Sequence, residues 1–421
     1  MDHFEIRDGV MHAEDISLEA LAAKVGTPFY CYSAATIERH YTVFANAVAG
    51  LGQGTPLVAF AVKANPNLSV LATLARLGAG ADVVSGGELA RALAAGIPAD
   101  RIVFSGVGKQ NHELAAGIEA GILQFNVESE AEIDMLGKVA AHYARPVEIS
   151  IRINPAVDPK THGKISTGGA DAKFGIPWDR VPAAFAQAAA HEWLRPIGLA
   201  AHIGSQLFDL GPVEDTIRRL GELARAMTAA GHNIKRIDCG GGLGVPYRAD
   251  QPLPPSPAAY AAMVARVTAG WPWRLMFEPG RMIVGNAGVL VSSVILTKEG
   301  ASKHFIVVDA AMNDLLRPSL YNAWHDFRAV RPRAERCVAT IVGPICETGD
   351  TFADDRDVEA VASGDLVAFM TAGAYGATMA STYNSRPLVP EVMVKGAQWS
   401  VVSERNQPAA MLALDALAPW L

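Results

Sequence analysis

Lys63 has the side chain best suited to covalent chemistry in this sequence. It follows six apolar residues, Leu57 to Val62, and precedes Asn65-Pro66, so the pattern predicts a buried strand that ends in an amine. The carboxyl ends of strands are where α/β proteins bind their ligands, and a lysine removed from water can lose its proton and attack a carbonyl. Two interpretations remain open at this point: a lysine that forms a Schiff base, or one whose long side chain reaches from the core to water.

Other polar and glycine-rich segments follow further apolar runs. They are Arg152 and Asn154, His202-Ile-Gly-Ser205, Gly240-Gly-Gly-Leu-Gly244, and Glu278-Pro-Gly-Arg281. A glycine-rich turn can present backbone N–H groups to a phosphate, and Arg281 adds a cation next to it. With an amine and a carboxylate such as Glu278, this set favours pyridoxal 5′-phosphate, which has an aldehyde, a phosphate and a pyridine nitrogen.

Three of these side chains allow more than one role. His202 is expected to stack on the cofactor ring, although acid/base work or a structural hydrogen bond would also suit it. Arg152 is expected either to keep Glu278 ionised or to form a structural ion pair inside the fold. Asp82 suits a structural acceptor as well as a site residue.

The elements that must position these residues alternate between short apolar strands and helical stretches rich in Ala and Leu. The predicted strands are 57–63, 81–85, 102–106, 123–128, 147–154, 197–205, 234–240 and 274–281. Eight such units predict a (β/α)8 TIM barrel, and the alternative is a doubly wound open sheet. After residue 283 the chain becomes rich in β-strand patterns, which predicts a second, all-β domain that the N-terminal strand pattern 4–10 completes. The expected division is 1–34, 35–283 and 284–421.

The composition indicates a soluble globular protein. Half of the 421 residues are hydrophobic and the net charge is -7, without the basic excess of a nucleic-acid-binding protein. No apolar run is long enough to span a membrane, and the first residues do not resemble a secretory signal. Four widely spaced cysteines predict neither a zinc site nor a disulfide framework, so the cytoplasm is the expected location.

Taken together, the motifs resemble those of the fold-type III PLP-dependent decarboxylases. The likeness rests on Phe-Ala-Val-Lys63-Ala-Asn, His202-Ile-Gly-Ser, Gly-Gly-Gly-Leu-Gly244, Glu278-Pro-Gly-Arg, Lys173-Phe-Gly175, Arg317-Pro-Ser-Leu-Tyr321, Ile345-Cys-Glu-Thr-Gly-Asp350, Gly373-Ala-Tyr-Gly376 and Tyr383-Asn-Ser-Arg-Pro387. The motifs follow the family's order over nearly the full chain. The resemblance implies an alanine-racemase-like barrel joined to a β-sandwich built from both chain ends, in a head-to-tail homodimer whose active sites are shared between subunits.

The resemblance also implies roles for individual residues. Lys63 would hold the cofactor as a Schiff base, His202 would stack on its ring, and Glu278 would bind the pyridine nitrogen. The full cofactor-binding set would be Lys63, His202, Ser205, Gly241, Gly242, Glu278, Gly280, Arg281 and Tyr375. The substrate-binding set would be Arg281, Arg317, Tyr321, Glu347 and Tyr375. Cys346, contributed with Glu347 by the neighbouring subunit, would protonate the substrate carbon after carbon dioxide leaves.

The implied reaction is the decarboxylation of meso-2,6-diaminopimelate to L-lysine and carbon dioxide, the last step of lysine biosynthesis. Arginine suits the carboxylate that stays and an acid suits the distant amine. Alternatives are a decarboxylase of ornithine, arginine or carboxynorspermidine, or a non-catalytic PLP-binding protein. Without the resemblance, Cys346 would be a small buried hydrophobe, and Arg317 with Tyr321 a surface pair on a short helix. The polar loop 158–171 is expected to be either a mobile lid or an ordinary solvated segment.

Overall fold

The computed structural model describes residues 2–157, 167–169, 172–248 and 250–421. The chain forms two compact units. One, the β unit, comprises residues 1–37, 246–251 and 284–421; the other, the barrel unit, comprises 38–245 and 252–283. Of the loop 158–171, which was expected to be a lid or a solvated segment, only residues 167–169 lie within the described residues.

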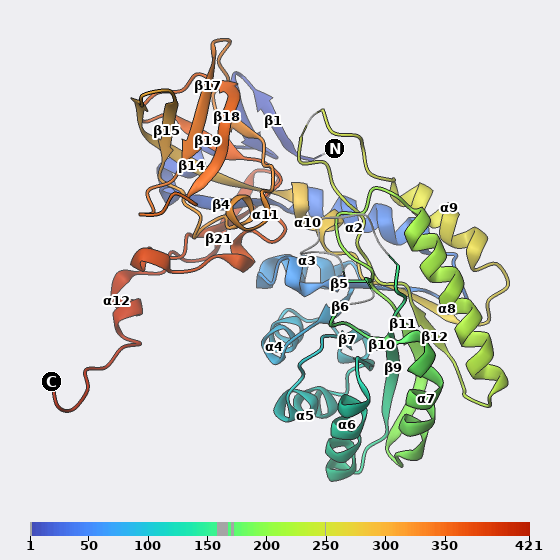
Figure 1. Cartoon of the computed structure of the whole chain (residues 1–421). Coiled ribbons are helices and arrows are strands. Elements are labelled where there is room, and N and C mark those ends of the chain that lie inside the picture. Colours follow the sequence, from blue (N-terminus) through green and yellow to red (C-terminus); the bar gives the residue numbers. More distant parts are fainter. Residues whose placement is uncertain (1, 158–166, 170–171, 249) are drawn as a thin grey trace. The chain divides into compact units, whose positions relative to one another are not determined.

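Eight parallel strands of the barrel unit close on themselves (Figure 1). They are β5 (Leu57–Ala61), β6 (Gly80–Val83), β7 (Ile102–Phe104), β8 (Gln124–Val127), β9 (Val147–Asn154), β11 (Leu194–Ala200), β12 (Arg236–Asp238) and β13 (Arg274–Phe277). Strand β8 pairs with β9, and β13 pairs back with β5, which closes the ring. This closure confirms the predicted TIM barrel and excludes the open sheet.

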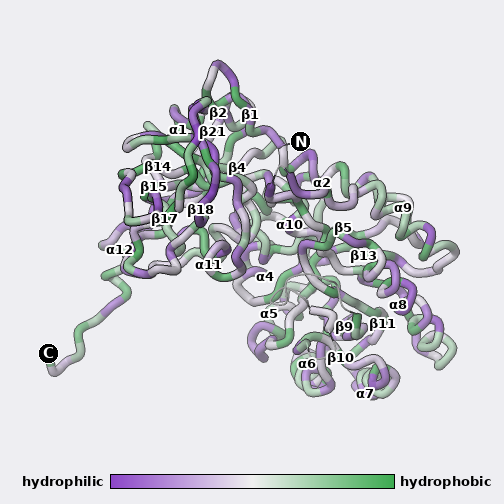
Figure 2. The backbone as a smooth tube through the Cα atoms, turned by 45° about the horizontal axis from the view of Figure 1, so that its top comes forward, coloured by the Kyte–Doolittle hydropathy of each residue, from purple (hydrophilic) through white to green (hydrophobic). Residues whose placement is uncertain are grey.

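Helices connect the barrel strands and cover them. They are α2 (Ala34–Val48), α3 (Leu68–Arg76), α4 (Gly86–Ala94), α5 (Asn111–Ala120), α6 (Glu130–Tyr143), α7 (Val181–Ala190), α8 (Gly211–Ala229), α9 (Pro257–Val267) and α10 (Arg281–Val284). Along α8, hydrophobic and hydrophilic residues alternate (Figure 2). Its buried residues include Val213, Ile217, Leu220 and Ala224, spaced three or four apart, as expected of one helix face against a core.

Seven of the eight predicted barrel strands end earlier in the structure than in the sequence pattern, and two of these ends bear on the site. Strand β5 ends at Ala61, and Val62–Ala64 form a 3₁₀ turn in which the N–H of Asn65 donates to the carbonyl of Val62. Lys63 therefore lies on a turn just beyond the strand. Strand β12 ends at Asp238, because Gly240 adopts a φ of 67°, which a strand residue does not.

The β unit contains a small antiparallel sheet and a larger mixed sheet. The small sheet has β1 (Phe4–Arg7), β2 (Val10–Ala13) and β3 (Ile16–Ser17). The mixed sheet has β4 (Phe29–Ser33), β14 (Gly288–Glu299), β15 (His304–Val308), β16 (Phe327–Ala329), β17 (Arg336–Val342), β18 (Thr351–Glu359), β19 (Leu366–Phe369), β20 (Glu391–Lys395) and β21 (Gln398–Ser403). Three short helices, α1 (Leu18–Val25), α11 (Arg317–Tyr321) and α12 (Pro408–Leu412), belong to the same unit.

The N-terminal segment completes the larger sheet, as predicted, but through a different strand. Strand β4 pairs antiparallel with β14 and parallel with β20, so it lies between strands from the far end of the chain. The predicted strand 4–10 instead splits into β1 and the start of β2, which form their own hairpin. The two-residue connection at Asp8-Gly9, both with positive φ, makes this turn.

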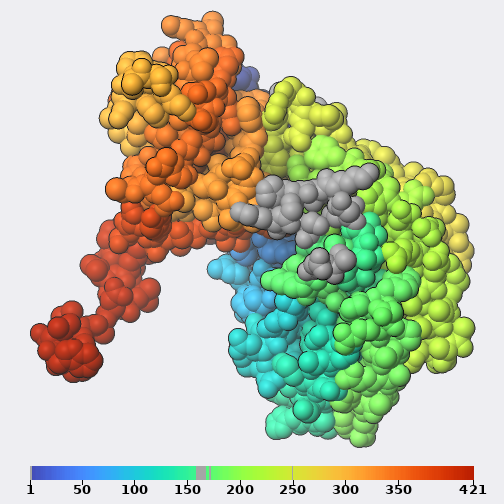
Figure 3. Space-filling view, viewed as in Figure 1, coloured from blue at the N-terminus to red at the C-terminus, as the bar shows by residue number. Residues whose placement is uncertain are grey.

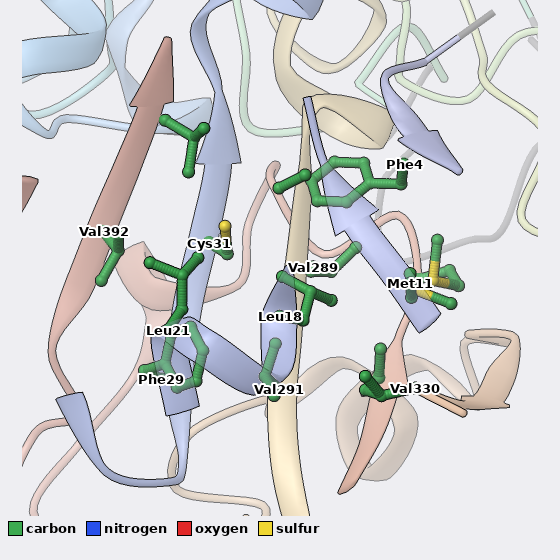
Figure 4. Packing of buried hydrophobic residues seen from close by; sticks show 14 of the residues in the cluster. Phe4, Met11, Leu18, Leu21, Phe29, Cys31, Val289, Val291, Val330 and Val392 are labelled. Carbon is green, nitrogen blue, oxygen red and sulfur yellow. The ribbon is translucent and has the colours of Figure 1, made fainter. Parts of the chain in front are cut away.

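One hydrophobic cluster joins both ends of the chain in the β unit (Figure 4). Its members include Phe4, Met11, Leu18, Leu21, Phe29 and Cys31 from the N-terminal part and Val289, Val291, Val330 and Val392 from the C-terminal part. Burying a large apolar side chain contributes about 1.5–3 kcal/mol. The N-terminal residues are therefore an integral part of this core.

The buried carboxylate of Glu14 ties three segments of the β unit together. Its Oε1 accepts hydrogen bonds from the Ser33 hydroxyl (2.8 Å) and the Ala35 N–H (2.9 Å). Its Oε2 accepts one from the N–H of Gly396 (2.6 Å), in the turn between β20 and β21. A single acid thus satisfies donors from both ends of the chain.

The last residues described are exposed and do not belong to this core. After α12 the chain extends away from the sheets of its unit as an arm (Figure 3). Leu414, Leu417 and Trp420 in this arm are 84–87% exposed. The β unit therefore folds without burying them. Elsewhere, no helix in the described part of the chain is long and apolar enough to cross a membrane.

The Glu14→Gln variant should lower the free energy of unfolding by about 1–3 kcal/mol. Gln replaces one carboxylate oxygen with an N–H₂ group, so a buried group that now donates to Glu14 would face another donor and lose its acceptor. The surface change Glu19→Gln is the matched control. Glu19 forms an exposed ion pair with Arg331, so its loss should cost less than about 1 kcal/mol. Urea unfolding monitored by circular dichroism measures both, and equal losses would contradict the structural role of Glu14.

Candidate active site

The amine of Lys63 is held by a buried carboxylate of the neighbouring strand. Its Nζ donates to Oδ2 of Asp82 at 2.7 Å, and the two side chains are 33% and 0% exposed. Asp82 lies on β6, which pairs with β5, so the strand pairing itself brings acid and amine together. Asp82 is therefore an ion-pair partner of Lys63, which agrees with either of the two roles that the sequence allowed.

Glu278 is a buried acid just beyond β13. Its Oε1 has no hydrogen-bond partner among the described residues. Burial raises the pKa of the Glu278 carboxyl well above its ordinary value; the negative charges of Asp238 and Asp82 raise it further, and the positive charge of Lys63 opposes them. Burial and these charges therefore favour the protonated form of Glu278 in the protein without a ligand.

His202 lies just beyond β11 as an uncharged ring. Its Nδ1 accepts a hydrogen bond from the N–H of Gly241 at 3.2 Å, so this nitrogen carries no proton. Burial lowers the pKa of His202 well below its ordinary value, and the positive charges of Lys63 and Arg152 lower it further. A neutral, oriented imidazole suits stacking on a ligand ring, the role expected from the sequence, and the hydrogen bond shows that it also has a structural contact.

The glycine loop after β12 approaches the end of β13 more closely than any side chain would allow. A Cβ on Gly241 would lie 2.0 Å from the carbonyl oxygen of Glu278. A Cβ on Gly242, whose φ is 108°, would lie 2.4 Å from the carbonyl oxygen of Gly204. Both positions therefore require glycine, and the loop presents bare backbone at the strand ends.

Arg281 and Ser205 are joined across the same end of the barrel. Nε and Nη2 of Arg281 donate to the Ser205 hydroxyl oxygen at 3.3 and 3.1 Å. Arg281 is 5% exposed, and it begins α10 immediately after Gly280. A Cβ on Gly280 would lie 3.0 Å from the Cβ of Ala61, so a small residue is favoured there. Cation, hydroxyl and glycine backbone together can bind an anion.

Arg152 pairs with a different acid from the one considered in the sequence. Its Nη1 donates to Oε1 of Glu128 at 2.7 Å, instead of to Glu278. Glu128 also accepts hydrogen bonds from the backbone N–H groups of Gly106 and Gly175. Arg152 lies over the Phe174 ring at 4.9 Å. The alternative of a structural ion pair inside the barrel is therefore the correct one, because Glu128 directly follows the adjacent strand β8 and lies within reach.

Two of the predicted residues lie in one loop of the β unit. Cys346 is exposed, which excludes the buried hydrophobe that its apolar neighbours suggested. Oε2 of Glu347 accepts a hydrogen bond from the Tyr383 hydroxyl at 2.9 Å. The buried carboxylate of Asp350 accepts hydrogen bonds from the N–H groups of Ile345 (2.7 Å) and Met312 (2.6 Å). Asp350 thus fixes the loop that presents the thiol and the acid.

Arg317 and Tyr321 lie on helix α11 of the β unit, and the expectation of a surface pair is wrong for Arg317. This arginine is 6% exposed. Its Cζ lies 4.5 Å from the centre of the Tyr247 ring, and its Nη1 is 2.8 Å from Nε2 of His325. Tyr375, in the same unit, adopts a positive φ of 56° between Ala374 and Gly376. Arg317 is thus held by defined side-chain contacts, and Tyr375 has a defined backbone conformation.

The structure brings together one part of the predicted site within the barrel unit and another within the β unit. The barrel residues are Lys63, His202, Ser205, Gly241, Gly242, Glu278, Gly280 and Arg281; the β-unit residues are Arg317, Tyr321, Cys346, Glu347 and Tyr375. Sequence reasoning missed Asp238, His325 and Tyr247. Asp350 and Tyr383 occur in the motifs that carried the resemblance, and that position was the only signal of their roles.

The barrel residues fit the chemistry of pyridoxal 5′-phosphate. Lys63 offers an amine for its aldehyde, the unpartnered oxygen of Glu278 offers a contact for its ring nitrogen, and Arg281, Ser205 and the glycine backbone offer donors for its phosphate. In the described part of the chain, no three His, Cys, Asp or Glu side chains are grouped as a metal site would require.

Comparison with known proteins gives matches over the full chain. The family model described as pyridoxal-dependent decarboxylase, pyridoxal binding domain, matches residues 34–285. Over 418 residues, the chain is 51% identical to a diaminopimelate decarboxylase of Zymomonas mobilis, with 99% of each chain covered. It is 48% identical over 420 residues to a diaminopimelate decarboxylase of Pseudomonas aeruginosa, with 100% of both chains covered.

Solved structures agree with the sequence relatives. Diaminopimelate decarboxylase of M. jannaschii in complex with L-lysine has a TM-score of 0.94 and 35% identity, covering 100% of this chain and 99% of that one. The enzyme of that name from Helicobacter pylori, also with L-lysine, has a TM-score of 0.90 and 39% identity, covering 94% and 98%. Both similarities extend over the barrel unit and the β unit.

The Glu278→Gln variant should gain stability relative to the parent as pH rises. Because burial raises the folded-state pKa of Glu278, the folded chain binds more protons than the unfolded chain above about pH 4.3, and the parent loses stability through this window. Gln does not titrate. Urea unfolding of the cofactor-free proteins measures the free energy of unfolding of variant and parent at pH 5 and pH 8. The value for the variant minus that for the parent should be larger at pH 8 than at pH 5. An identical difference at both pH values would contradict a buried, protonated Glu278.

Proposed function

Because the chain belongs to the pyridoxal-dependent decarboxylases, and within them to the diaminopimelate decarboxylases, we propose that it converts meso-2,6-diaminopimelate to L-lysine and carbon dioxide, the last step of lysine biosynthesis. The observation that carries the proposal is the arrangement at the barrel strand ends, where an amine, a buried acid with a raised pKa and a glycine loop lie in a chain half identical to a named enzyme. The finer assignments below belong to the same proposal.

The cofactor would be held mainly by the barrel residues. Pyridoxal 5′-phosphate, when bound, supplies an electron sink for the carbon that loses its carboxyl group. Lys63 would bind its aldehyde and Glu278 its ring nitrogen, while His202 would cover a face of the ring. The phosphate would be bound by a set of backbone, hydroxyl and cationic groups: Ser205, Gly241, Gly242, Gly280, Arg281 and Tyr375.

The proton states in the barrel suit this task. Burial raises the pKa of Glu278 and so favours its protonated form in the free protein, and Oε1 could share such a proton with a ring nitrogen. His202 stays neutral, so it adds no positive charge where it would meet the ring. Asp82 holds Nζ of Lys63 in place whenever the amine is free. The surroundings of Glu278 and His202 thus favour the neutral form of each before the ligand arrives.

The β-unit residues would recognise the substrate and return a proton. Arg317 and Tyr321, with Arg281, would bind the carboxylate that remains, and Glu347 the distant ammonium group, with Tyr375 alongside. The exposed thiol of Cys346 would donate a proton from Sγ to the carbon that has lost carbon dioxide. A diamino dicarboxylic acid needs both signs of charge at its far end, which favours it over ornithine, arginine or carboxynorspermidine as the substrate.

We further propose that the enzyme works as a head-to-tail homodimer in the cytoplasm. Each active site would combine the barrel residues 35–283 of one copy with Cys346 and Glu347 of the other. The sequence ranges 1–34 and 284–421 would form the β domain that carries the loop across. Two-fold symmetric dimers are the commonest assemblies, and this arrangement would give two equivalent sites.

Product analysis tests the reaction directly. PLP-loaded protein incubated with meso-diaminopimelate should release carbon dioxide and L-lysine in equal amounts. Ornithine and arginine should react far more slowly, since neither carries a second carboxylate. Lys63→Ala is the control and should lose the covalent cofactor bond and nearly all turnover. Faster carbon dioxide release from ornithine or arginine would overturn the substrate, and turnover without PLP would overturn the mechanism.

Complementation tests the shared sites. Lys63→Ala and Cys346→Ala, each nearly inactive alone, should recover up to about a quarter of the parent's activity when co-expressed, since about half of random dimers are mixed and each of these has one intact site. Dimers purified through two different tags isolate the mixed species. No recovery in a confirmed mixed dimer would show that Lys63 and Cys346 act within one copy.

A further inference from the structure

We infer that His325 is a positioning residue, which orients the guanidinium of Arg317 toward the carboxylate that the substrate keeps. The inference rests on the proposed function, because it assumes that Arg317 binds this carboxylate. It adds a residue whose side chain would act through Arg317. All the groups involved lie in the β unit.

The neighbours of His325 fix both its ring orientation and its tautomer. His325 is 1% exposed. Its Nδ1 lies 2.9 Å from the carbonyl oxygen of Met370, and its Nε2 lies 2.8 Å from Nη1 of Arg317. A carbonyl only accepts and a guanidinium only donates, so Nδ1 carries the proton and Nε2 offers a lone pair. A neutral imidazole thus accepts one N–H of Arg317 from a single direction.

Tyr247 restrains the same guanidinium from another side. The Cζ of Arg317 lies 4.5 Å from the centre of the Tyr247 ring. The rings of Tyr247 and His325 meet edge to face, with centres 5.2 Å apart and an interplanar angle of 81°. Arg317 is therefore covered by an aromatic ring and hydrogen-bonded through Nη1. A guanidinium restrained in this way is prepared for the planar, two-point contact that a carboxylate prefers.

The backbone that carries His325 is itself held by stacked arginines. The guanidinium of Arg356 lies 3.5 Å from the centre of the Trp324 ring, and that of Arg248 lies 4.6 Å from it. Nη1 of Arg356 also donates to the carbonyl oxygen of His325 at 2.6 Å. Tyr247 and Arg248 are consecutive, so one short segment contacts both Arg317 and Trp324. These contacts leave the imidazole little freedom, as a positioning residue requires.

Two substitutions separate the contact with Arg317 from the contact with Met370. His325→Asn keeps an N–H₂ near the Nδ1 position but cannot reach Arg317. His325→Gln places its amide oxygen near the Nε2 position and can still accept from Arg317. In the holoenzyme, His325→Asn should raise KM for meso-diaminopimelate about 10-fold or more while kcat changes less than about 3-fold, and His325→Gln should recover most of the loss in KM.

A pair of inhibitors distinguishes orientation of Arg317 from a general structural role. L-lysine carries a carboxylate, and cadaverine is the same molecule without it. His325→Asn should weaken competitive inhibition by L-lysine about 10-fold and leave cadaverine unchanged. Equal weakening of both, or of neither, would overturn the inference. If His325→Asn does not yield folded holoenzyme, Tyr247→Leu should show the same selective weakening of inhibition by L-lysine. If Tyr247→Leu does not show it, the inference is overturned as well.

Arg317→Gln, measured alongside, separates this inference from the proposed function. If Arg317→Gln leaves KM for meso-diaminopimelate and inhibition by L-lysine unchanged, the substrate-binding role of Arg317 fails, and the role of His325 fails with it. If Arg317→Gln weakens both but His325→Asn and Tyr247→Leu do not, only the positioning role is wrong. Selective loss in all three variants supports both.

Discussion

The structure depends above all on ionisable groups held away from water at one end of a closed barrel. Asp82, Asp238 and Glu278 are buried close enough for the charge of one to raise the proton affinity of another, and Lys63 is the cation that opposes them at Glu278. Placing charges there is costly, so the strand pairing must hold them rigidly. The same cost raises the pKa of Glu278 and favours its neutral form, a shift of the kind that acid/base chemistry uses.

Much of the fold could be predicted from the sequence because its strands bury both faces. Uninterrupted apolar runs such as Leu57 to Val62 indicate such strands, and eight of them alternate with helices. Strand ends were less predictable: β5 stops at Ala61 because the chain turns, although Val62 is as apolar as the residues before it. The position of β4 was also out of reach, since its partners β14 and β20 are far away along the chain.

For the site, sequence reasoning identified the functional residues more successfully than the residues that contact them. Lys63 and Glu278 stand out because charged residues are rare at the ends of apolar runs. Their neighbours depend on which strands lie side by side, so the sequence left open whether Arg152 would contact Glu278 or form a structural ion pair, and only the structure shows its pairing with Glu128. His325 gave no signal at all, because a histidine after a short helix has no characteristic pattern. Its contact with Arg317 exists only in the folded β unit.

The place of β4 in the mixed sheet also determines the order in which the protein can fold during synthesis. The ribosome makes β4 among the first residues, but β14 and β20 emerge only much later. The barrel strands, in contrast, follow one another along the chain, so they can close while β4 still has two unpaired edges. Such edges are prone to pair with other chains, which exposes the nascent protein to aggregation and to chaperones. Strand β4 therefore lacks its second neighbour until β20 has been synthesised.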